Sequence, residues 1–231
     1  QKTRAQYDFS SIRTLLHMAA VCPPQVKRAW IEMIGADAVW EIYGGTERIG
    51  STIIGGVEWL KHPGSVGRPR EGIEVQILND AGGDVPTGQV GEIYFRRAGG
   101  PDSTFRYIGA DARRRGDWAS FGDMGRLDNE GYLYIADRRT DMIVSGGVNI
   151  FPAEIEAQID SLDGVLDSIV TAAPHHDLGV VPHAFVQLHA QSPAWSEVSL
   201  IEALRGRLAP HKLPRGVTFV DTSLRDDSGK I

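Results

Sequence analysis

Apolar residues recur on one helical face near the start of the chain. Over residues 24–34 these positions are Val26, Ala29, Trp30, Met33 and Ile34. Pro23 and Pro24 precede them and Gly35 follows, and proline favours the first turn of a helix as glycine favours its end. The pattern therefore predicts one helix here. The apolar run from Val39 to Tyr43 predicts a short buried strand that ends at two glycines.

From residue 64 to residue 136 the pattern changes to short alternating runs separated by turn-forming residues. The clearest runs are Ile73–Ile77, Val90–Phe95 and Tyr132–Ile135, and the clearest turns are Asn79–Gly83 and Asp128–Gly131. Several short strands at close spacing are typical of a small antiparallel sheet or barrel. We therefore expect a β-rich, barrel-like subdomain at the end of a larger α/β domain that covers residues 1–136.

The rest of the chain, residues 142–231, predicts a small α+β domain. Strand-like runs lie at 142–144, 169–173, 184–188 and 216–220. Pro152 suits the start of a helix with Ile155, Ile159 and Leu162 on one face. Ser196 can cap a second helix with Ile201, Leu204 and Leu208 on one face. The charged run 137–141 separates two apolar strands, so the domain boundary is expected there.

Composition narrows the class of protein. The 231 residues carry 24 Lys and Arg against 30 Asp and Glu, a net charge of −6, which argues against a nucleic-acid binder. No stretch approaches the roughly 18 apolar residues of a membrane span. One cysteine, Cys22, excludes a disulfide framework and a cysteine-cluster metal site, and fits a cytoplasmic location. The chain starts at Gln1 rather than Met, which indicates a fragment or a trimmed sequence.

A first segment with candidate chemistry is Tyr43-Gly44-Gly45-Thr46-Glu47. Two glycines after a buried strand let the backbone come close to a ligand. The Thr46 hydroxyl could donate to a phosphate oxygen. The Glu47 carboxylate could hold Mg²⁺, which prefers oxygen ligands beside substrate phosphates. A tight turn with an exposed acid remains the alternative.

A second candidate is Asp123, after Phe121-Gly122, together with Asp137-Arg138. A carboxylate beside a glycine can accept both hydroxyls of a ribose, and an arginine at a later strand end could complete that pocket. A turn aspartate and a surface ion pair are the alternative, and such a pair contributes little to stability.

Two further segments follow. In Ser145-Gly146-Gly147, glycines after a strand permit a narrow passage for a thin ligand, or simply form a strand–helix connection. In Ser228-Gly229-Lys230-Ile231, a lysine on a flexible loop could enter a cleft as a point charge, or could be a solvated tail lysine. The segment is not a Walker loop, because Leu224 occupies the position of that motif's first glycine.

Other clusters favour structural interpretations. His175-His176-Asp177 has no partner cluster and is expected to form a surface loop rather than a metal site. Arg113–Arg115 is expected to be a solvated run. His17 and Cys22 could form a thiol–imidazole pair, but residues 15–23 favour a packed strand and turn.

Taken together, the order and spacing of these segments resemble the C-terminal portion of the adenylate-forming superfamily: acyl- and aryl-CoA synthetases, peptide-synthetase adenylation domains and beetle luciferases. The matching stretches are Tyr43–Glu47, Gly64–Pro69, Pro86–Ile93, Asp117-Trp118, Gly122-Asp123, Asp137–Glu156 and Ser228–Ile231. They cover essentially the whole chain. Among members of this superfamily, the chain resembles fatty-acid-type acyl-CoA synthetases most, including bacterial enzymes that activate long-chain or steroid-like acids.

The resemblance implies a two-step reaction with ATP, Mg²⁺ and coenzyme A. A carboxylic acid is activated as an acyl-adenylate, and the CoA thiol then displaces AMP. It implies that ATP or AMP is bound by Tyr43, Gly44, Gly45, Thr46, Asp123, Ile135, Arg138 and Lys230. It implies a catalytic role for Lys230, Glu47 and Thr46, with Glu47 also holding Mg²⁺. It further implies that Ser145, Gly146 and Gly147 bind CoA and that Thr140 belongs to a hinge within 137–141. The small domain would rotate about that hinge between the steps.

Four departures from the family pattern stand out. Thr140 replaces the usual Asp or Lys of the hinge, Phe121 the usual Thr, and Gln89 a usual Glu. The family's Ser/Thr/Gly-rich phosphate loop lies upstream of these motifs and is absent from the 231 residues. The chain alone is therefore predicted to be catalytically incompetent.

Two other functions remain open at this stage. One is an adenylation enzyme that loads an acyl carrier protein, and the other is a non-catalytic fragment or interaction module. Intact charges at Glu47, Asp123, Arg138 and Lys230 favour a working nucleotide site over the latter. The substrate is expected to be a long-chain or polycyclic acid, and a homodimer is one alternative for the oligomeric state.

Overall fold

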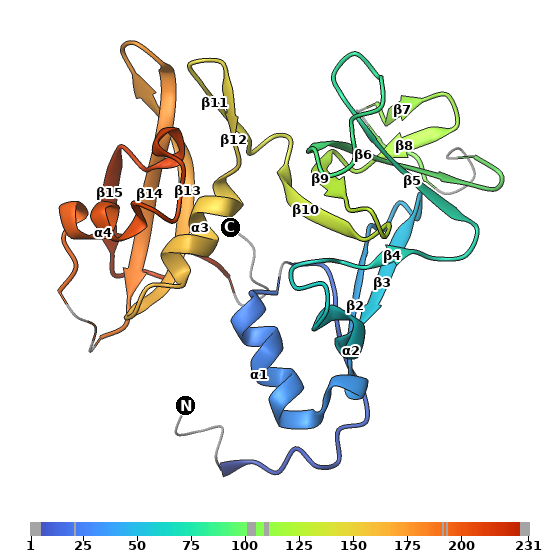
Figure 1. Ribbon diagram of the computed structural model, residues 1–231, viewed down its shortest axis with the longest axis horizontal. Coiled ribbons are helices and arrows are strands. Elements are labelled where there is room, and N and C mark those ends of the chain that lie inside the picture. Colours follow the sequence, from blue (N-terminus) through green and yellow to red (C-terminus); the bar gives the residue numbers. More distant parts are fainter. Residues whose placement is uncertain are drawn as a thin grey trace. The chain divides into compact units, whose positions relative to one another are not determined.

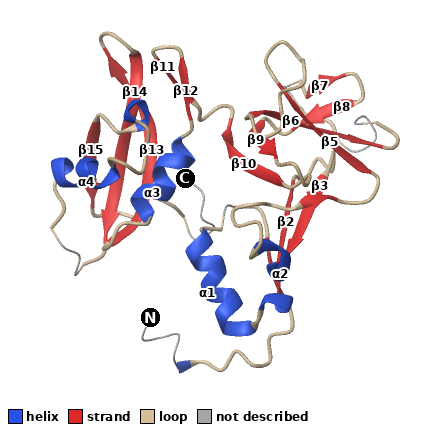
Figure 2. Cartoon of the chain, in the orientation of Figure 1, coloured by secondary structure: helices blue, strands red, loops and turns tan. Residues whose placement is uncertain are grey.

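The computed structural model describes residues 6–20, 22–100, 105–108, 111–190, 192 and 194–226 (Figure 1). The chain separates into two compact units, Gln1–Ile135 and Ala136–Ile231, and each is described by itself. Strands predominate over helices in both (Figure 2), so the predicted mixed α/β and α+β class is confirmed. Among the helices of the described residues, none has the length and apolar character that crossing a membrane requires.

The first unit begins with a four-stranded sheet in the order β1-β2-β3-β4. Its strands are β1 (Leu15–His17), β2 (Val39–Gly44), β3 (Ser51–Gly55) and β4 (Arg68–Pro69). β1 is parallel to β2, while the other pairs are antiparallel. The helical elements of this region are α1 (Pro24–Ile34), the short η2 (Ala36–Ala38) and α2 (Gly56–Trp59). Their shared core holds Ile31, Val39, Ile54, Trp59 and Tyr132.

The predicted helix α1 is confirmed at both of its ends. It begins at Pro24 and ends before Gly35, whose φ of 90° lies in the left-handed region that favours glycine. The buried face differs from the predicted one, because Lys27 and Ile31 are buried and Val26 is 43% exposed. The Lys27 ammonium pairs with the Glu41 carboxylate of β2 and lies 4.9 Å from the centre of the Trp59 ring. The buried cation is therefore compensated by an anion and an aromatic face.

The second sheet of this unit is the predicted β-rich region. Its six strands are β5 (Ile73–Leu78), β6 (Gly91–Arg97), β7 (Arg113–Arg115), β8 (Trp118–Ser120), β9 (Asp123–Leu127) and β10 (Leu133–Arg138). They follow the order β10-β9-β6-β8-β7, with β5 also paired to β6. Among the described residues this is an open, branched path, so the region forms a sheet and not the closed barrel that the strand spacing also allowed. The run Arg113–Arg115, predicted to be solvated, is the edge strand β7 and pairs with β8.

The second unit contains a two-stranded and a three-stranded sheet. The strands are β11 (Ile143–Ser145) and β12 (Val148–Ile150), then β13 (Val165–His175), β14 (Gly179–Leu188) and β15 (Gly216–Val220). β14 is central, antiparallel to β13 and parallel to β15. The helical elements are α3 (Pro152–Asp160), α4 (Glu197–Leu204) and the short η4 (Pro210–Lys212).

The two helices of this unit bury apolar faces in one core. Ile155 and Ile159 of α3 and Leu200 and Leu204 of α4 have no exposed surface. The predicted cap of α4 is confirmed, since the Ser196 hydroxyl accepts a hydrogen bond from the Ser199 amide at 3.1 Å. The buried face of α4 is offset from the predicted one, because Leu200 takes the place expected for Ile201.

Candidate active site

A tight loop after β2 carries the first candidate segment. Tyr43 and Gly44 end the strand, and Gly44 pairs with Ser51 at the start of β3. Within the loop the Arg48 amide donates to the Gly45 carbonyl at 3.1 Å, and Arg48 has a positive φ of 55°. The turn therefore leaves Thr46 exposed at its tip, with Glu47 half-buried beside it.

Tyr43 reaches the second candidate segment directly. Its phenol donates a hydrogen bond of 2.6 Å to Oδ2 of Asp123, the first residue of β9. The two residues are 80 positions apart in the chain. The structure thus brings together two segments that the sequence analysis could connect only by resemblance. Ile135 of β10 packs, like Tyr43, against the same apolar cluster of the first unit.

Gly45 allows the loop to approach an aromatic side chain. A methyl carbon added at Gly45 would lie 2.5 Å from Cε1 of Phe121, closer than side chains tolerate. Phe121 also meets the Tyr43 ring edge-on, with centroids 6.1 Å apart, and the Phe95 ring at 5.6 Å. Phe121, the departure from the family's usual threonine, therefore acts as a packing residue under the loop.

Glu47 has a partner that the sequence analysis missed. The Tyr107 phenol donates to Oε1 of Glu47 at 2.7 Å, and this hydrogen bond raises the pKa of Tyr107 to about 12. Oε2 lies 3.4 Å from the Thr46 hydroxyl. A half-buried carboxylate beside a hydroxyl offers the hard oxygen ligands that Mg²⁺ takes, typically one or two carboxylates plus substrate phosphates. The residues present fit such an ion.

The candidate residues at the domain boundary lie in the second unit. Arg138 ends β10 and is exposed, and the Asp141 amide donates to its carbonyl at 3.1 Å, which forms a turn around Thr140. The Thr140 hydroxyl donates to Asp141 at 3.0 Å. The hinge role of Thr140 and the ribose role of Arg138 stay predictions.

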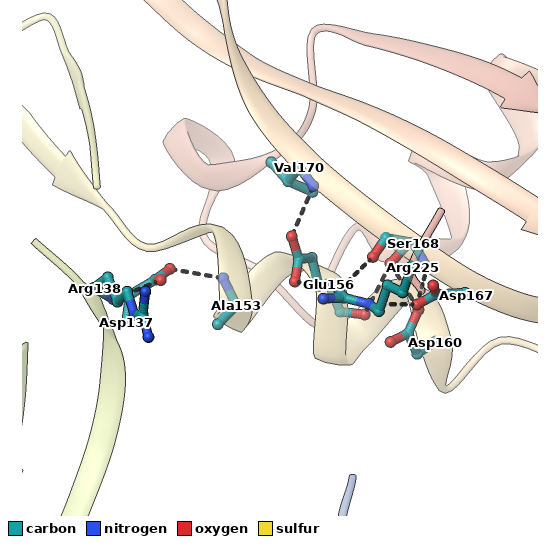
Figure 3. Close-up of polar contacts among 9 residues, drawn as sticks. All are labelled: Asp137, Arg138, Ala153, Glu156, Asp160, Asp167, Ser168, Val170 and Arg225. Atoms are coloured by element: carbon teal, nitrogen blue, oxygen red, sulfur yellow. Dashed lines mark hydrogen bonds and ion pairs between the residues drawn. The ribbon is translucent and has the colours of Figure 1, made fainter. Parts of the chain in front are cut away.

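Asp137, at the end of β10, caps the start of helix α3, which lies later in the chain. Its Oδ2 accepts a hydrogen bond from the Ala153 amide at 3.0 Å, and its Oδ1 accepts from the Arg138 amide at 2.7 Å (Figure 3). Ala153 is the second residue of α3, and Phe151 at the N-cap position offers no side-chain acceptor. The aspartate therefore supplies the cap that the helix lacks, and ties the end of β10 to the start of α3.

The glycine pair of the third segment forms a hairpin turn. Ser145 of β11 pairs with Val148 of β12, and Gly146 and Gly147 between them have φ of 55° and 83°. Positive φ at both central residues is the requirement of a type I′ turn. The Gly146 amide also donates to the Leu178 carbonyl at 3.1 Å. The turn geometry explains both glycines, and the predicted contact of this hairpin with CoA stays a prediction.

The remaining candidates are Lys230 and the two segments that contain His17 and His175. Lys230 lies outside the described residues. His17, in strand β1, is 3.3 Å from the Glu41 carboxylate, and the Cys22 thiol donates to the Pro23 carbonyl at 3.8 Å, which favours the packed strand over a thiol–imidazole pair. In the loop after β13, Nδ1 of His175 accepts the Asp177 amide at 3.2 Å. His175, His176 and Asp177 offer ligand atoms that lie within 4.8 Å of one another, so the expectation that this loop is not a metal site stays a prediction.

Comparisons with known proteins agree on one family. The model of AMP-binding enzymes matches residues 1–101, and that of the AMP-binding enzyme C-terminal domain matches residues 154–230. A (methyl-dioxo-octahydro-indenyl)propanoyl:CoA ligase of Rhodococcus jostii is 35% identical over 99% of this chain and 43% of its own length. A long-chain-fatty-acid–CoA ligase of Bacillus subtilis is 33% identical over 97% of this chain and 40% of its own length.

Solved structures extend the match to the fold. o-Succinylbenzoate CoA synthetase from Bacillus subtilis, in complex with its acyl-adenylate intermediate, superposes with a TM-score of 0.83 at 30% identity, covering 100% of this chain and 47% of that one. The same synthetase in complex with ATP and a magnesium ion gives 0.79 at 31% identity, covering 95% and 45%. The chain spans less than half the length of each of these relatives.

Proposed function

Because this chain belongs to the AMP-binding, adenylate-forming enzymes, we propose that the protein containing it is an AMP-forming acid–CoA ligase. The observation that carries the proposal is the 2.6 Å contact between Tyr43 and Asp123, beside a glycine loop that leads to Glu47. It assembles an aromatic ring, a carboxylate and an open backbone on one unit, which are the groups a bound nucleoside needs. Two relatives that match almost the whole of this chain are named as CoA ligases.

In the adenylation step, each residue of the first unit has a separate task. A carboxylate offers about four lone-pair sites, so Asp123 can keep the Tyr43 hydrogen bond and still accept ribose hydroxyls. The Tyr43 ring would lie against adenine, beside the exposed backbone of Gly44 and Gly45. Thr46, exposed at the loop tip, would donate to a phosphate oxygen.

Glu47 would hold Mg²⁺ between the loop and the phosphates. The Tyr107 hydrogen bond fixes one of its oxygens and so limits the rotation of the carboxylate. The ion, when bound, supplies positive charge against the phosphates as pyrophosphate departs. Lys230 would supply a second positive charge at the reacting phosphate, where charge develops in the transition state.

The second unit would serve the thioester step. We assign CoA to the hairpin of Ser145, Gly146 and Gly147. A Cβ atom added at Gly147 would meet no other atom within 4 Å, so the space beside this turn is open. We assign the hinge to the turn at Thr140 and place Arg138 beside the ribose. Each of these is a proposal based on the family motifs.

The acid is proposed to be large and apolar, either long-chain or polycyclic. The names of two relatives support this range, since one acts on a fatty acid and the other on a fused-ring propanoyl group. We propose a cytoplasmic location, and the basis for this is only that the sequence contains a single cysteine. We also expect the 231 residues by themselves not to turn over, because they contain no Ser/Thr/Gly-rich phosphate loop.

The test uses the natural polypeptide that contains these 231 residues, at the length its gene encodes. It is incubated with ATP, Mg²⁺, CoA and a panel of fatty and fused-ring acids, and pyrophosphate and acyl-CoA are measured. Asp123→Ala is expected to abolish both products. Asp84→Asn changes an exposed residue directly after the Asn79–Gly83 turn of the same unit. It is the control and should leave both products unchanged.

Three outcomes separate the alternatives. Acyl-CoA formation lost with Asp123→Ala supports the ligase. Pyrophosphate release with transfer to an acyl carrier protein, and none to CoA, favours the loading enzyme. Absence of binding of an acyl-adenylate analogue by calorimetry contradicts both, and favours a non-catalytic protein.

A further inference from the structure

Strand β6 supports the loop that connects β2 to β3. Side chains alternate along a strand, so Phe95 and Arg97 lie on the same face of β6. A Cβ atom added at Gly50, the last residue of the loop, would clash with the Phe95 ring, which shows how closely the two segments approach. Two residues further along β6, Arg97 therefore stands beside the same loop.

Arg97 contacts the main chain of the loop. Its Nη1 donates a hydrogen bond of 2.9 Å to the Arg48 carbonyl, although the two residues are 49 positions apart in the sequence. The Arg97 side chain is half-buried at the end of β6. A hydrogen bond from a charged donor is stronger than one between neutral groups. The contact therefore ties β6 to the residue that directly follows Glu47.

The backbone of Arg48 needs such support. Its φ of 55° lies in the left-handed region, which is unfavourable for a residue with a side chain. Among the described residues, Ala19 is the only other non-glycine residue with a positive φ. Conformations of this kind persist only where the surrounding structure holds them. The Arg48 amide donates to the Gly45 carbonyl at 3.1 Å, so Arg97 completes the pairing of both backbone groups of this residue.

We propose that Arg97 is a positioning residue for Glu47 and Thr46, because its hydrogen bond fixes the loop that carries both side chains. The inference rests on the proposed function, in which Glu47 holds Mg²⁺ and Thr46 donates to a phosphate oxygen. Without the guanidinium, the Arg48 backbone is free to leave the left-handed region, and the direction of the Glu47 side chain changes with it. Binding of Mg²⁺ and ATP then includes the entropy cost of ordering the loop, which lowers the affinity.

The neighbouring Arg96 provides a matched control. It lies on the opposite face of β6, where its Nε donates to Glu74 of β5 at 3.1 Å and its guanidinium lies 4.8 Å from the centre of the Trp118 ring. Arg96→Ala therefore removes the same charge from the same strand and leaves the loop contact in place. An effect of net charge on ATP binding is common to both variants, whereas an effect of the loop belongs to Arg97 alone.

The first measurement is hydrogen exchange in the natural polypeptide without ligands. Arg97→Ala is expected to accelerate exchange of the Arg48 amide by about threefold or more, because the turn opens more often once its carbonyl side is released. Arg97→Lys keeps a charged donor but not the planar guanidinium, and should show a smaller acceleration. Arg96→Ala should match wild type. The Gly88 amide, hydrogen-bonded elsewhere in the unit, is the internal reference and should be unchanged in all three variants.

The second measurement is calorimetric binding of a non-hydrolysable ATP analogue in the presence of Mg²⁺. Loss of a group that bonds a metal ligand directly typically lowers metal affinity about 10- to 100-fold. Arg97 acts one residue further away and through the backbone, so Arg97→Ala is expected to weaken binding by about three- to tenfold. Arg97→Lys should lie between Arg97→Ala and wild type, and Arg96→Ala should bind as wild type does.

The third measurement separates the two half-reactions. In Arg97→Ala, pyrophosphate release from ATP and acid should need a higher Mg²⁺ concentration for its half-maximal rate, by about the same three- to tenfold factor. Acyl-CoA formation from saturating supplied acyl-adenylate and CoA should stay within about twofold of wild type. The reason is that the ion held by Glu47 acts against pyrophosphate, which has left before this step.

The outcomes distinguish the inference from the function on which it rests. Equal exchange of the Arg48 amide in Arg97→Ala and Arg96→Ala would overturn the anchor. Faster exchange with unchanged Mg²⁺ dependence, or equal slowing of both half-reactions, would overturn the positioning role while the ligase function stands. A wild-type protein that forms no adenylate from any acid would overturn the proposed function instead, and the exchange rates would still show whether Arg97 holds the loop.

Discussion

Tyr43 and Asp123 meet through a hydrogen bond of 2.6 Å, although 80 residues separate them. Tyr43 comes from the end of β2 in the first sheet and Asp123 from the start of β9 in the second. The contact therefore joins the two sheets of one unit at the place where both candidate nucleotide segments lie. A carboxylate held by a phenol donor is already oriented before a ligand arrives, which lowers the ordering cost of binding.

Tyr43→Phe tests this orientation. The variant loses a hydrogen bond to a charged group, so we expect a loss of about 1 to 3 kcal/mol in the free energy of unfolding. We also expect weaker binding of an acyl-adenylate analogue, by about three- to tenfold. Denaturant unfolding and calorimetry measure the two effects. Tyr134→Phe is the control, since that phenol bonds Asp128 at 3.1 Å, and equal losses of analogue affinity in both variants would contradict the prediction.

Gly45→Ala tests the close approach of the loop to Phe121. No positive φ is needed at Gly45, so the cost arises from the added methyl group, which would lie 2.5 Å from both the Phe121 ring and Oε2 of Glu47. We expect a loss of about 1 to 3 kcal/mol in the free energy of unfolding. The Glu47 side chain can rotate away, whereas the packed Phe121 ring cannot. Phe121→Thr in the same chain should therefore relieve the clash with the ring, with a coupling energy of about 1 kcal/mol or more in a double-mutant cycle.

Gly83→Ala provides the matched control for that cycle. Gly83 is exposed in a turn, and its added methyl would meet Asn79 at an ordinary contact distance of 3.4 Å. This variant should be close to wild type in stability. A Gly45→Ala chain as stable as Gly83→Ala would show that the loop moves away from Phe121 at no cost.

Local signals in the sequence were sufficient for several elements. The limits of α1 follow from Pro24 and Gly35, because proline and glycine act on the backbone of their own neighbourhood. The cap of α4 by Ser196 is of the same kind. The order of the motifs was also sufficient to place Tyr43, Glu47 and Asp123 in one family pattern.

Contacts between distant segments were not predictable. Arg113 and Arg115 are exposed, as the predicted solvated run requires, but the pairing of this run with β8 as a strand was not predicted. Tyr107 and Glu47 are 60 residues apart, and no local pattern connects them. Asp137 was assigned to a charged boundary, but its carboxylate caps α3 because Phe151 has no side-chain acceptor. Each of these depends on pairing or packing that a single sequence does not contain.

Asp137→Ala is predicted to weaken the start of α3. The Ala153 amide would lose its acceptor, and loss of an N-terminal cap typically costs about 0.5 to 2 kcal/mol. Hydrogen exchange of the Ala153 amide measures the effect directly and should accelerate. Asp137→Asn keeps one acceptor oxygen and should show a smaller change. Unchanged exchange in Asp137→Ala would mean that another group caps the helix.

The buried carboxyl of Asp160 predicts how stability depends on pH. Burial raises its folded-state pKa from an ordinary value of 3.8 to about 6. The folded protein therefore binds a proton more tightly than the unfolded chain, so this group's contribution to stability is greatest below pH 4 and is lost as the pH rises to about 6. Asp160→Asn removes the titration while keeping an acceptor for the Ser168 hydroxyl.

We therefore expect Asp160→Asn to be more stable than wild type at pH 7. Two pKa units correspond to about 3 kcal/mol, which solvent screening of a partly exposed carboxyl reduces to about 1 kcal/mol. The difference should shrink as the pH falls through 6 and vanish below pH 4. Denaturant unfolding between pH 3.5 and 7.5, on the order of ten points, measures it. Asp163→Asn, an exposed aspartate just after the same helix, should follow the wild-type profile throughout, and a pH-independent gap between wild type and Asp160→Asn would contradict the assignment.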